Sequence, residues 1–253
     1  MPYTTQQHSP RTPDSPLWMV LPPTDAHAAA QPGDLIQHPA GPRDDLHFDL
    51  PHAEWLHAHS ARAESLATAF WSGEVEQLTD LTTWRLLQVE PVGTWYPVAR
   101  QQWPYWHKAR TYTVTGDAPI WEALGPNGQD VLALHELVTE LTQQDAERLA
   151  AHWHARGQQA WQRAALKRVH AIFQGRRAAS ETAKESAATV IWDMTEGLPE
   201  QSRIAATTLV ETLTETIVVR DLLEPEHYAT LTRPWNRALN LPLPDRSLTA
   251  ISA

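Results

Sequence analysis

The chain of 253 residues contains no cysteine. Disulfides, iron–sulfur clusters, thiolate zinc sites and cysteine nucleophiles are therefore excluded. A chain without cysteine suits a reducing compartment, which predicts a cytoplasmic location.

Long apolar runs are also missing. The longest ones, such as Ala187 to Trp192, stop well short of the ~20 residues that a membrane span requires. The N-terminus lacks the order of basic and then apolar residues that is typical of a signal peptide. We expect a soluble, unsecreted protein without a membrane span.

Glycine is scarce, and the glycine motifs of nucleotide and hydrolase sites are absent. There is no Gly-x-x-x-x-Gly-Lys loop, no Gly-x-Gly-x-x-Gly after a strand and no Gly-x-Ser-x-Gly elbow. His135-Glu136 begins like a zincin motif, but Thr139 stands where the second histidine is required. We expect no cofactor and no catalytic residues, so the sequence favours a protein that is not an enzyme.

The apolar content of 42% is sufficient for a packed core. The order of elements predicts an α+β chain, with a small Trp-rich N-terminal domain that contains a short sheet, and a helical-bundle C-terminal domain. The expected divisions are a disordered leader at 1–16, the Trp-rich α+β domain at 17–118, the helical domain at 119–238 and a tail at 239–253.

Proline and glycine divide the N-terminal half into short elements. A three-to-four spacing of apolar residues predicts an amphipathic helix over 52–71. Pro32, Pro39 and Pro42 predict irregular backbone before that helix. Apolar and β-branched segments predict strands at Leu17–Leu21, Trp84–Glu90, Trp95–Ala99 and Ala109–Thr115.

After Pro119 the pattern is almost entirely helical. Thr142 and Asp145 have the spacing of a capping box, so a long helix should start there and end near Gly175, a suitable left-handed stop. The other expected helices are Trp121–Leu124, Val131–Leu141, Ser180–Thr195, Glu200–Leu223 and Pro225–Leu231.

The chain has 12 tryptophans, and aromatic residues are densest between residues 95 and 106. Such a cluster could stack bases or sugars. Pro97 and Pro104 instead favour a loop folded against the domain, so packing is the preferred interpretation. The aromatic cluster consists of Trp95, Tyr96, Trp103, Tyr105 and Trp106.

Histidines raise the question of a metal site. Four of them, His47, His52, His57 and His59, lie close together in the sequence. On a helix His52 and His59 would be two turns apart, whereas zinc ligands on one helix are three or four residues apart. We expect solvated or capping histidines and no metal.

Two adjacent segments carry opposite charge in a chain whose net charge is −10. Residues 148–184 contain eight basic residues and one acidic residue, and residues 185–226 contain nine acidic and two basic residues. On a helical projection the basic positions fall within an arc of about 100°. This predicted basic stripe consists of Arg148, His152, Arg156, Arg163, Lys167 and His170.

The basic stripe allows three interpretations. It can pair with acidic residues of the following helices, such as Glu200, Glu211 and Glu215. It can bind an acidic partner protein, or it can lie along a nucleic acid or an anionic membrane surface. Because the chain as a whole repels polyanions, pairing inside the fold is preferred.

Residues 17–118 resemble an enzyme family through four segments in order: Gln31-Pro32-Gly33-Asp34-Leu35, Leu46-His47-Phe48, Leu87-Gln88-Val89-Glu90-Pro91-Val92-Gly93 and Lys108-Ala109-Arg110. The family is the small ADP-ribosyltransferases that inactivate rifamycins, in which a His-Gly-Thr motif, a tyrosine and an aspartate hold NAD. The corresponding positions here are Leu17-Trp18-Met19-Val20, His47 and a segment, 94–102, that contains no acid. The resemblance implies a related shape with a lost or altered site.

The C-terminal part contains Val218-Val219-Arg220-Asp221-Leu222-Leu223, Glu226-His227-Tyr228 and Pro234-Trp235. It is similar to the C-terminal ends of alanine-rich proteins of actinobacteria and their phages. This similarity implies a helical ending and a phage or mobile-element context.

These observations predict a non-catalytic interaction protein with a protein partner and an oppositely charged helical module. The alternatives are a divergent ADP-ribosyltransferase-like enzyme and a nucleic-acid-associated protein that uses the basic helix over 143–174.

Overall fold

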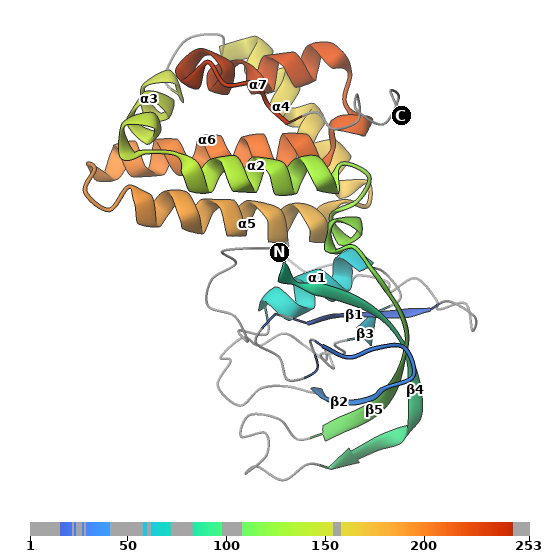
Figure 1. The fold of residues 1–253 in the computed structure, drawn as a ribbon. Helices are drawn as coiled ribbons and strands as arrows, with labels where there is room; N and C mark the ends of the chain where they lie inside the picture. Colours follow the sequence, from blue (N-terminus) through green and yellow to red (C-terminus); the bar gives the residue numbers. More distant parts are fainter. Residues whose placement is uncertain are drawn as a thin grey trace, which may run out of the picture.

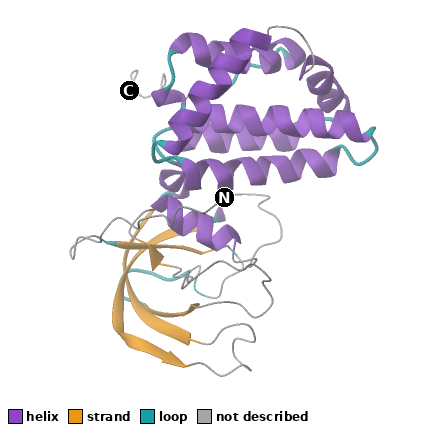
Figure 2. Cartoon of the chain, turned by 180° about the vertical axis from the view of Figure 1, so that it is seen from behind, coloured by secondary structure: helices purple, strands orange, loops and turns teal. Residues whose placement is uncertain are grey.

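The computed structural model describes residues 16–40 except 22, 24–26 and 28, and residues 58–59, 62–71, 83–97, 108–153 and 158–244. A curved antiparallel sheet forms one layer, and the helices form a larger mass beside it (Figure 1). Strands and helices are segregated in the same way when the molecule is seen from behind (Figure 2). The predicted α+β class with a helical C-terminal region is confirmed.

The described sheet has the strand order β2-β5-β4-β1-β3, and all neighbouring strands are antiparallel. β1 occupies the predicted position, and its side chains are mostly buried in two apolar clusters, one on each face of the sheet. The strands are β1 Leu17–Leu21, β2 Leu35–Ala40, β3 Ala58–His59, β4 Arg85–Pro97 and β5 Lys108–Ala118.

The prediction of irregular backbone around Pro39 is wrong, because Pro39 lies in the strand β2. The strand pairs with β5 from Leu35 opposite Thr113 to Ala40 opposite Lys108, and it is one of the two edge strands of the described sheet. Proline lacks a backbone N–H, and an edge strand tolerates this because one of its sides needs no hydrogen-bonding partner. Pro39 therefore does not prevent a strand at this position.

β4 and β5 are longer than predicted. β4 runs through Pro91 and Gly93 and joins the strands predicted at 84–90 and 95–99. β5 likewise continues past Gly116. The register between the two strands shifts twice, between Gln88 and Val89 and between Val92 and Tyr96. The strands therefore continue past the turn-forming residues, with a local irregularity in the pairing at each shift.

The helix predicted over 52–71 is shorter in the structure. α1 spans Arg62–Trp71, and Ala58–His59 instead pair with β1. α1 lies between the sheet and the other helices (Figure 1) and packs against both β1 and α5 (Arg177–Met194). Its Leu66 is fully buried there.

Several predicted helices are confirmed. The 3₁₀ turn Ile120–Leu124 and the following helix are separated at Pro126, as expected. The last helix is longer than predicted, because it continues through Pro234 to Leu239. The remaining helices are α2 Gly128–Glu140, α3 Gln143–Trp153, α4 Gln158–Phe173, α6 Glu200–Val218 and α7 Pro225–Leu239.

The prediction of one long helix from Thr142 to Gly175 is wrong. α3 ends at Trp153 and α4 begins at Gln158. The two helices also have different neighbours, since α3 packs against α6 and α7, whereas α4 packs mainly against α7. The predicted end is right: Gly175 follows α4 with a φ of 108°, in the left-handed region that favours glycine.

One apolar core continues from the sheet into the helices. Trp18 and Leu86 from the sheet, Leu66 from α1 and Trp235 from α7 belong to the same buried cluster. The alternate residues of β1 line a second cluster on the opposite face of the sheet. The sheet and the helices therefore share a core across the expected division at residue 118.

Charge pairs hold the helix ends together. Arg220 pairs with the buried Asp130 of α2 at 2.7 Å, and Asp221 pairs with Arg176 at 3.0 Å. The side-chain amide of Asn127 donates a hydrogen bond to Asp221 at 2.6 Å. These contacts tie the start of α2 to the start of α5 and the end of α6.

Candidate interaction surface

α3 begins at the predicted capping box. The Asp145 carboxylate accepts hydrogen bonds from the backbone N–H of Thr142 at 3.0 Å and from its hydroxyl at 2.6 Å. In return the N–H of Asp145 donates to Thr142 Oγ1 at 3.2 Å. The hydrogen bonds from Thr142 lower the pKa of Asp145. Arg148 pairs with Asp145 at 3.3 Å, so this member of the predicted stripe has its partner within α3.

α4 buries a face made largely of small residues. Its buried positions are Ala164, Arg168, Ala171 and Ile172, and the helix packs mainly against α7. Spacings of three and four residues place these positions in one row. Alanine allows close approach of the two helices but contributes little apolar area, so the polar contacts of Arg168 matter for holding α4 in place.

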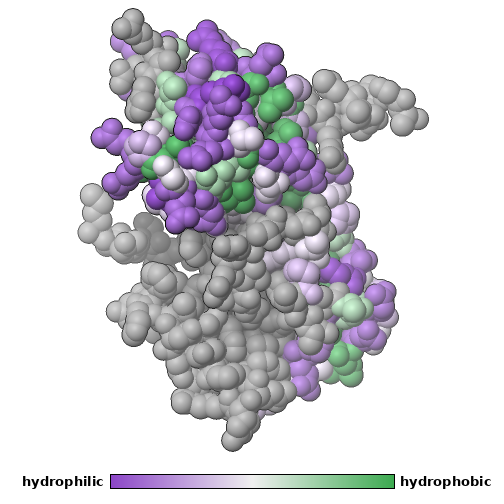
Figure 3. All heavy atoms as spheres, turned by 60° about the vertical axis from the view of Figure 1, so that its left-hand side comes forward, coloured by the Kyte–Doolittle hydropathy of each residue, from purple (hydrophilic) through white to green (hydrophobic). Residues whose placement is uncertain are grey.

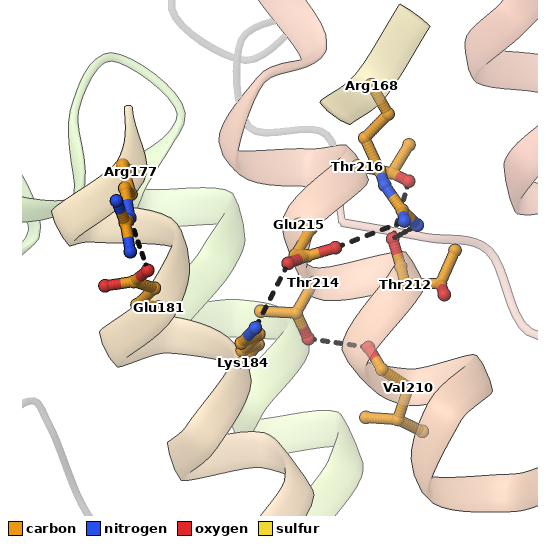
Figure 4. Close-up of polar contacts among 9 residues, drawn as sticks. All are labelled: Arg168, Arg177, Glu181, Lys184, Val210, Thr212, Thr214, Glu215 and Thr216. Atoms are coloured by element: carbon orange, nitrogen blue, oxygen red, sulfur yellow. Dashed lines mark hydrogen bonds and ion pairs between the residues drawn. The ribbon is translucent and has the colours of Figure 1, made fainter. Parts of the chain in front are cut away.

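Arg168 attaches α4 to α6. Its guanidinium pairs with Glu215 at 3.3 Å and donates a hydrogen bond to the carbonyl oxygen of Thr212 at 3.3 Å. The other Glu215 oxygen pairs with Lys184 of α5 at 3.6 Å, so this carboxylate lies between cations from two helices (Figure 4). Arg168 is only 8% exposed. Burial lowers the pKa of Arg168, and the neighbouring Glu215 and Glu211 oppose that shift.

Glu211 lies one turn before Glu215 on α6 and adds a second carboxylate to this cluster. Burial is the main reason that its pKa is raised. Lys184 and Arg168 favour its ionised form, while Glu185 and Glu215 disfavour it. The ionised form of Glu211 is therefore less favourable in the fold than in water.

The outer face of α4 is apolar and exposed. Leu166, Val169 and Phe173 are 71%, 39% and 67% exposed. They lie three and four residues apart, in a row opposite the buried alanines. Burial stabilises in proportion to apolar area, yet α4 exposes Leu166 and Phe173 and buries Ala164 and Ala171. We call Leu166, Val169 and Phe173 the apolar row.

Basic side chains lie along one side of the apolar row. Arg163, Lys167 and His170 are exposed, and their spacing puts them on one flank of α4. Within the described part of the chain, Arg163 and Lys167 have no ion pair. A ring nitrogen of His170 contacts the side-chain amide of Gln174 at 2.8 Å. The apolar row and this basic flank together form the outer surface of α4.

Exposed apolar residues on the other described helices do not form a row like that of α4. On the face drawn in Figure 3, small apolar groups lie between hydrophilic ones. Trp192 of α5 is partly exposed, but the guanidinium of Arg203 stacks over its ring at 4.0 Å. Over Phe173 the nearest such cation, Arg177, is 5.7 Å from the ring centre. Among the described helices, α4 alone presents three exposed large apolar side chains.

The predicted basic stripe is divided between two helices. Arg148 and His152 lie on α3, Arg163, Lys167 and His170 lie on α4, and Arg156 is outside the described residues. The expected pairing of the stripe with the acidic helices is wrong for the described members. Glu215 instead pairs with Arg168 and Lys184, which the projection left out. The signal that could have identified Arg168 is its position in the row of buried alanines.

The aromatic cluster is only partly within the described residues. Trp95 and Tyr96 lie on β4, and Trp103, Tyr105 and Trp106 are outside the description. Tyr96 is opposite Ala109 of β5, and its hydroxyl group is buried. The position of Tyr96 agrees with the packing interpretation.

The histidine group is likewise incomplete. His59 lies on β3, whereas His47, His52 and His57 are outside the described residues. Among the residues that the structure describes, no group of three or more histidines and carboxylates is placed to bind a metal ion. No helix in the same set is both long and apolar enough to cross a membrane.

The positions singled out by the ADP-ribosyltransferase resemblance can be placed in part. Trp18, Met19 and Val20 are buried in β1, so their side chains are closed to a nucleotide. His47 is outside the described residues. Comparison of the chain with models of known protein families, with curated protein sequences and with solved structures finds no match.

Proposed function

We propose that the protein is a non-catalytic interaction protein. In this proposal the outer surface of α4 binds an acidic amphipathic helix of a partner protein. The observation that supports this most strongly is the apolar row, exposed beside Arg163 and Lys167. Helices of this kind pair through residues at i, i+3 and i+7, which is the spacing of Leu166, Val169 and Phe173.

Charge complementarity determines the chemistry of the partner. The chain carries a net charge of −10, but the flank of α4 carries cations that have no ion pair within the described residues. A partner with acidic residues beside an apolar stripe can satisfy both parts of the surface. A nucleic acid would use the cations alone, since its phosphate backbone offers nothing to the apolar row.

The attachment of α4 supports a binding role. Arg168 and Glu215 fix the helix from its inner side, so the outer surface keeps one orientation without a partner. Preorganisation of this kind lowers the entropic cost of association. Phe173 is the best anchor for a pocket in the partner, because large aromatic side chains contribute most to interface energetics.

A designed peptide tests this proposal. The probe is a fluorescein-labelled helical peptide of about five turns with leucines at i, i+3 and i+7 and glutamates beside them. Fluorescence anisotropy should show saturable binding that the double variant Leu166→Ser/Phe173→Ser abolishes. Leu222→Ser, which alters an exposed leucine in the 3₁₀ turn 220–222, serves as the matched control and should bind normally.

Two further probes separate the alternatives. A peptide with lysines in place of the glutamates should bind much more weakly, and a short DNA duplex should not bind at moderate salt. Equal binding of both peptides would contradict the proposed charge recognition. Binding of the duplex without binding of the acidic peptide would favour the nucleic-acid alternative.

A further inference from the structure

The corner where α5 passes into α6 exposes two large apolar side chains. Trp192, near the end of α5, is 40% exposed, and Ile204, near the start of α6, is 49% exposed. Arg203 joins the two helices here: its guanidinium lies 4.0 Å from the centre of the Trp192 ring and donates a hydrogen bond to the Trp192 carbonyl oxygen at 3.2 Å. The two exposed side chains therefore lie on adjacent helices at the same end of the α5–α6 pair (Figure 1).

Acidic side chains accompany this apolar pair. Asp193 follows Trp192, Glu196 lies in the connection between the helices, and Glu200 lies one helical turn before Ile204. All three carboxylates belong to exposed residues, and none of them has an ion pair within the described part of the chain. We call Trp192, Asp193, Glu196, Glu200 and Ile204 the acidic corner.

The acidic corner is separate from the outer surface of α4. Arg168 attaches α4 to Glu215, which follows Ile204 on α6 by eleven residues. At 1.5 Å per residue this separation is about 16 Å along the helix. Because the acidic corner and the outer surface of α4 are both exposed, they do not cover each other within one molecule.

The two surfaces complement each other in chemistry. Each combines exposed large apolar side chains with charges that have no ion pair among the described residues, and the charges have opposite signs. The start of α6 also matches the kind of partner proposed for α4, since Glu200 and Ile204 are an acidic and an apolar residue on one face of a helix. One chain therefore carries both halves of a possible contact.

We infer that the partner of α4 is a second copy of this chain, which docks its acidic corner on the outer surface of α4. This inference rests on the function proposed for α4 and names its partner. Ile204 and Trp192 of the second copy would lie against the apolar row, and Glu200 of that copy would lie near Arg163 and Lys167. Few side chains anchor such a contact, so we expect weak association in the micromolar range.

A contact between two different surfaces has a consequence for assembly. After one contact has formed, the pair still carries one free surface of each kind. Further copies can then join in a ring or a chain, or the second contact can close a dimer. In each case the association depends on both surfaces, so a change in either one should prevent it.

Exchange of charge between the two surfaces tests the inference by sedimentation velocity. The weight-average sedimentation coefficient of the wild type should rise with protein concentration. Arg163→Glu/Lys167→Glu and Glu196→Lys/Glu200→Lys should each stay monomeric alone, because like charges then face each other. An equimolar mixture of the two variants should associate, because each altered surface then meets an opposite charge. General repulsion predicts a different result, since Glu196→Lys/Glu200→Lys lowers the net negative charge and should then associate more strongly.

The apolar part of the contact has its own variant and control. Ile204→Ser should raise the dissociation constant of self-association about tenfold, because the contact loses one buried apolar side chain. Leu222→Ser changes a side chain of similar exposure outside both surfaces and should associate like the wild type. An excess of the acidic helical peptide should dissociate the wild-type assembly, because it occupies α4.

Three results would overturn the inference: a wild type that stays monomeric at all concentrations, a mixture of the charge variants that does not associate, or association that every variant retains. The acidic peptide distinguishes this failure from failure of the function proposed for α4. Glu196→Lys/Glu200→Lys leaves α4 unchanged, so it should bind the peptide like the wild type. Peptide binding by a protein that stays monomeric would refute the second copy as the partner and leave the proposed function in place.

Discussion

Lys167 and Arg168 are neighbours on α4, yet only one of them supports the fold. Arg168 is buried and pairs with Glu215, whereas Lys167 is exposed beside the apolar row. One step along a helix rotates the side chain by about 100°, which is enough to move it from the inner face to the outer surface. A run of positive charge can therefore contain both structural and binding residues.

The largest expected effect comes from removing the inner cation. Arg168→Met should lower the free energy of unfolding by about 3 kcal/mol, because it leaves the partly buried Glu215 and Glu211 with less compensation. Lys167→Met, the matched control at the adjacent position, should stay within about 0.5 kcal/mol of the wild type. Urea denaturation measures both. Equal losses in the two variants would show that the two faces of α4 are not distinct.

A smaller loss is expected at the start of α3. Thr142→Ala removes both the cap of the helix and a donor to Asp145, and it should cost about 1 kcal/mol. The lowered pKa of Asp145 stabilises the fold above the unfolded pKa, and this contribution is lost as the pH falls through the folded pKa. The difference between wild type and variant should therefore shrink in acid. Thr139→Ala is the control, because it loses only a hydrogen bond to a carbonyl oxygen of its own helix. Its effect on the free energy of unfolding should not change with pH in this way.

Glu211→Gln should raise stability at neutral pH, in contrast to Arg168→Met in the same cluster. The folded pKa of Glu211 is raised, so its contribution is present below the unfolded pKa and is lost as the pH rises through the folded pKa. Neutral glutamine avoids that loss, and the gain should vanish in acid. Thermal unfolding between pH 4 and 7, roughly the range around the ordinary glutamate pKa, measures this. Glu200→Gln, at an exposed position of α6, should show no such trend.

Local signals in the sequence predicted the fold well where the structure depends only on residues that are neighbours in the chain. The capping box at Thr142 and the left-handed stop at Gly175 are recognisable because neighbouring residues supply the whole interaction. Pro39 and Gly93 were misleading, because whether a strand tolerates them depends on its position in the sheet. That position results from pairing between distant segments.

The candidate surface was predictable only in part. The basic flank was found, but the projection treated residues 142–175 as one helix and so joined α3 to α4. α4 has two apolar rows, and the row with the larger side chains would be expected in the core. The opposite face is buried instead, and Arg168 on that face pairs with Glu215, which is distant in the sequence. The spacing of Leu166 and Phe173 was visible, but the face they occupy was not.

The smallest effect on stability is expected from reversing the outer charges. Arg163→Glu/Lys167→Glu should stay within about 0.5 kcal/mol of the wild type in urea denaturation, since both side chains are exposed. The same variant should lose binding to the acidic peptide, because the flank then repels its glutamates. Reversal of the peptide to lysines should recover part of that binding. A stability loss near that of Arg168→Met would instead mean that the basic flank pairs within the fold. That result would contradict the proposal that the outer surface of α4 is a binding site.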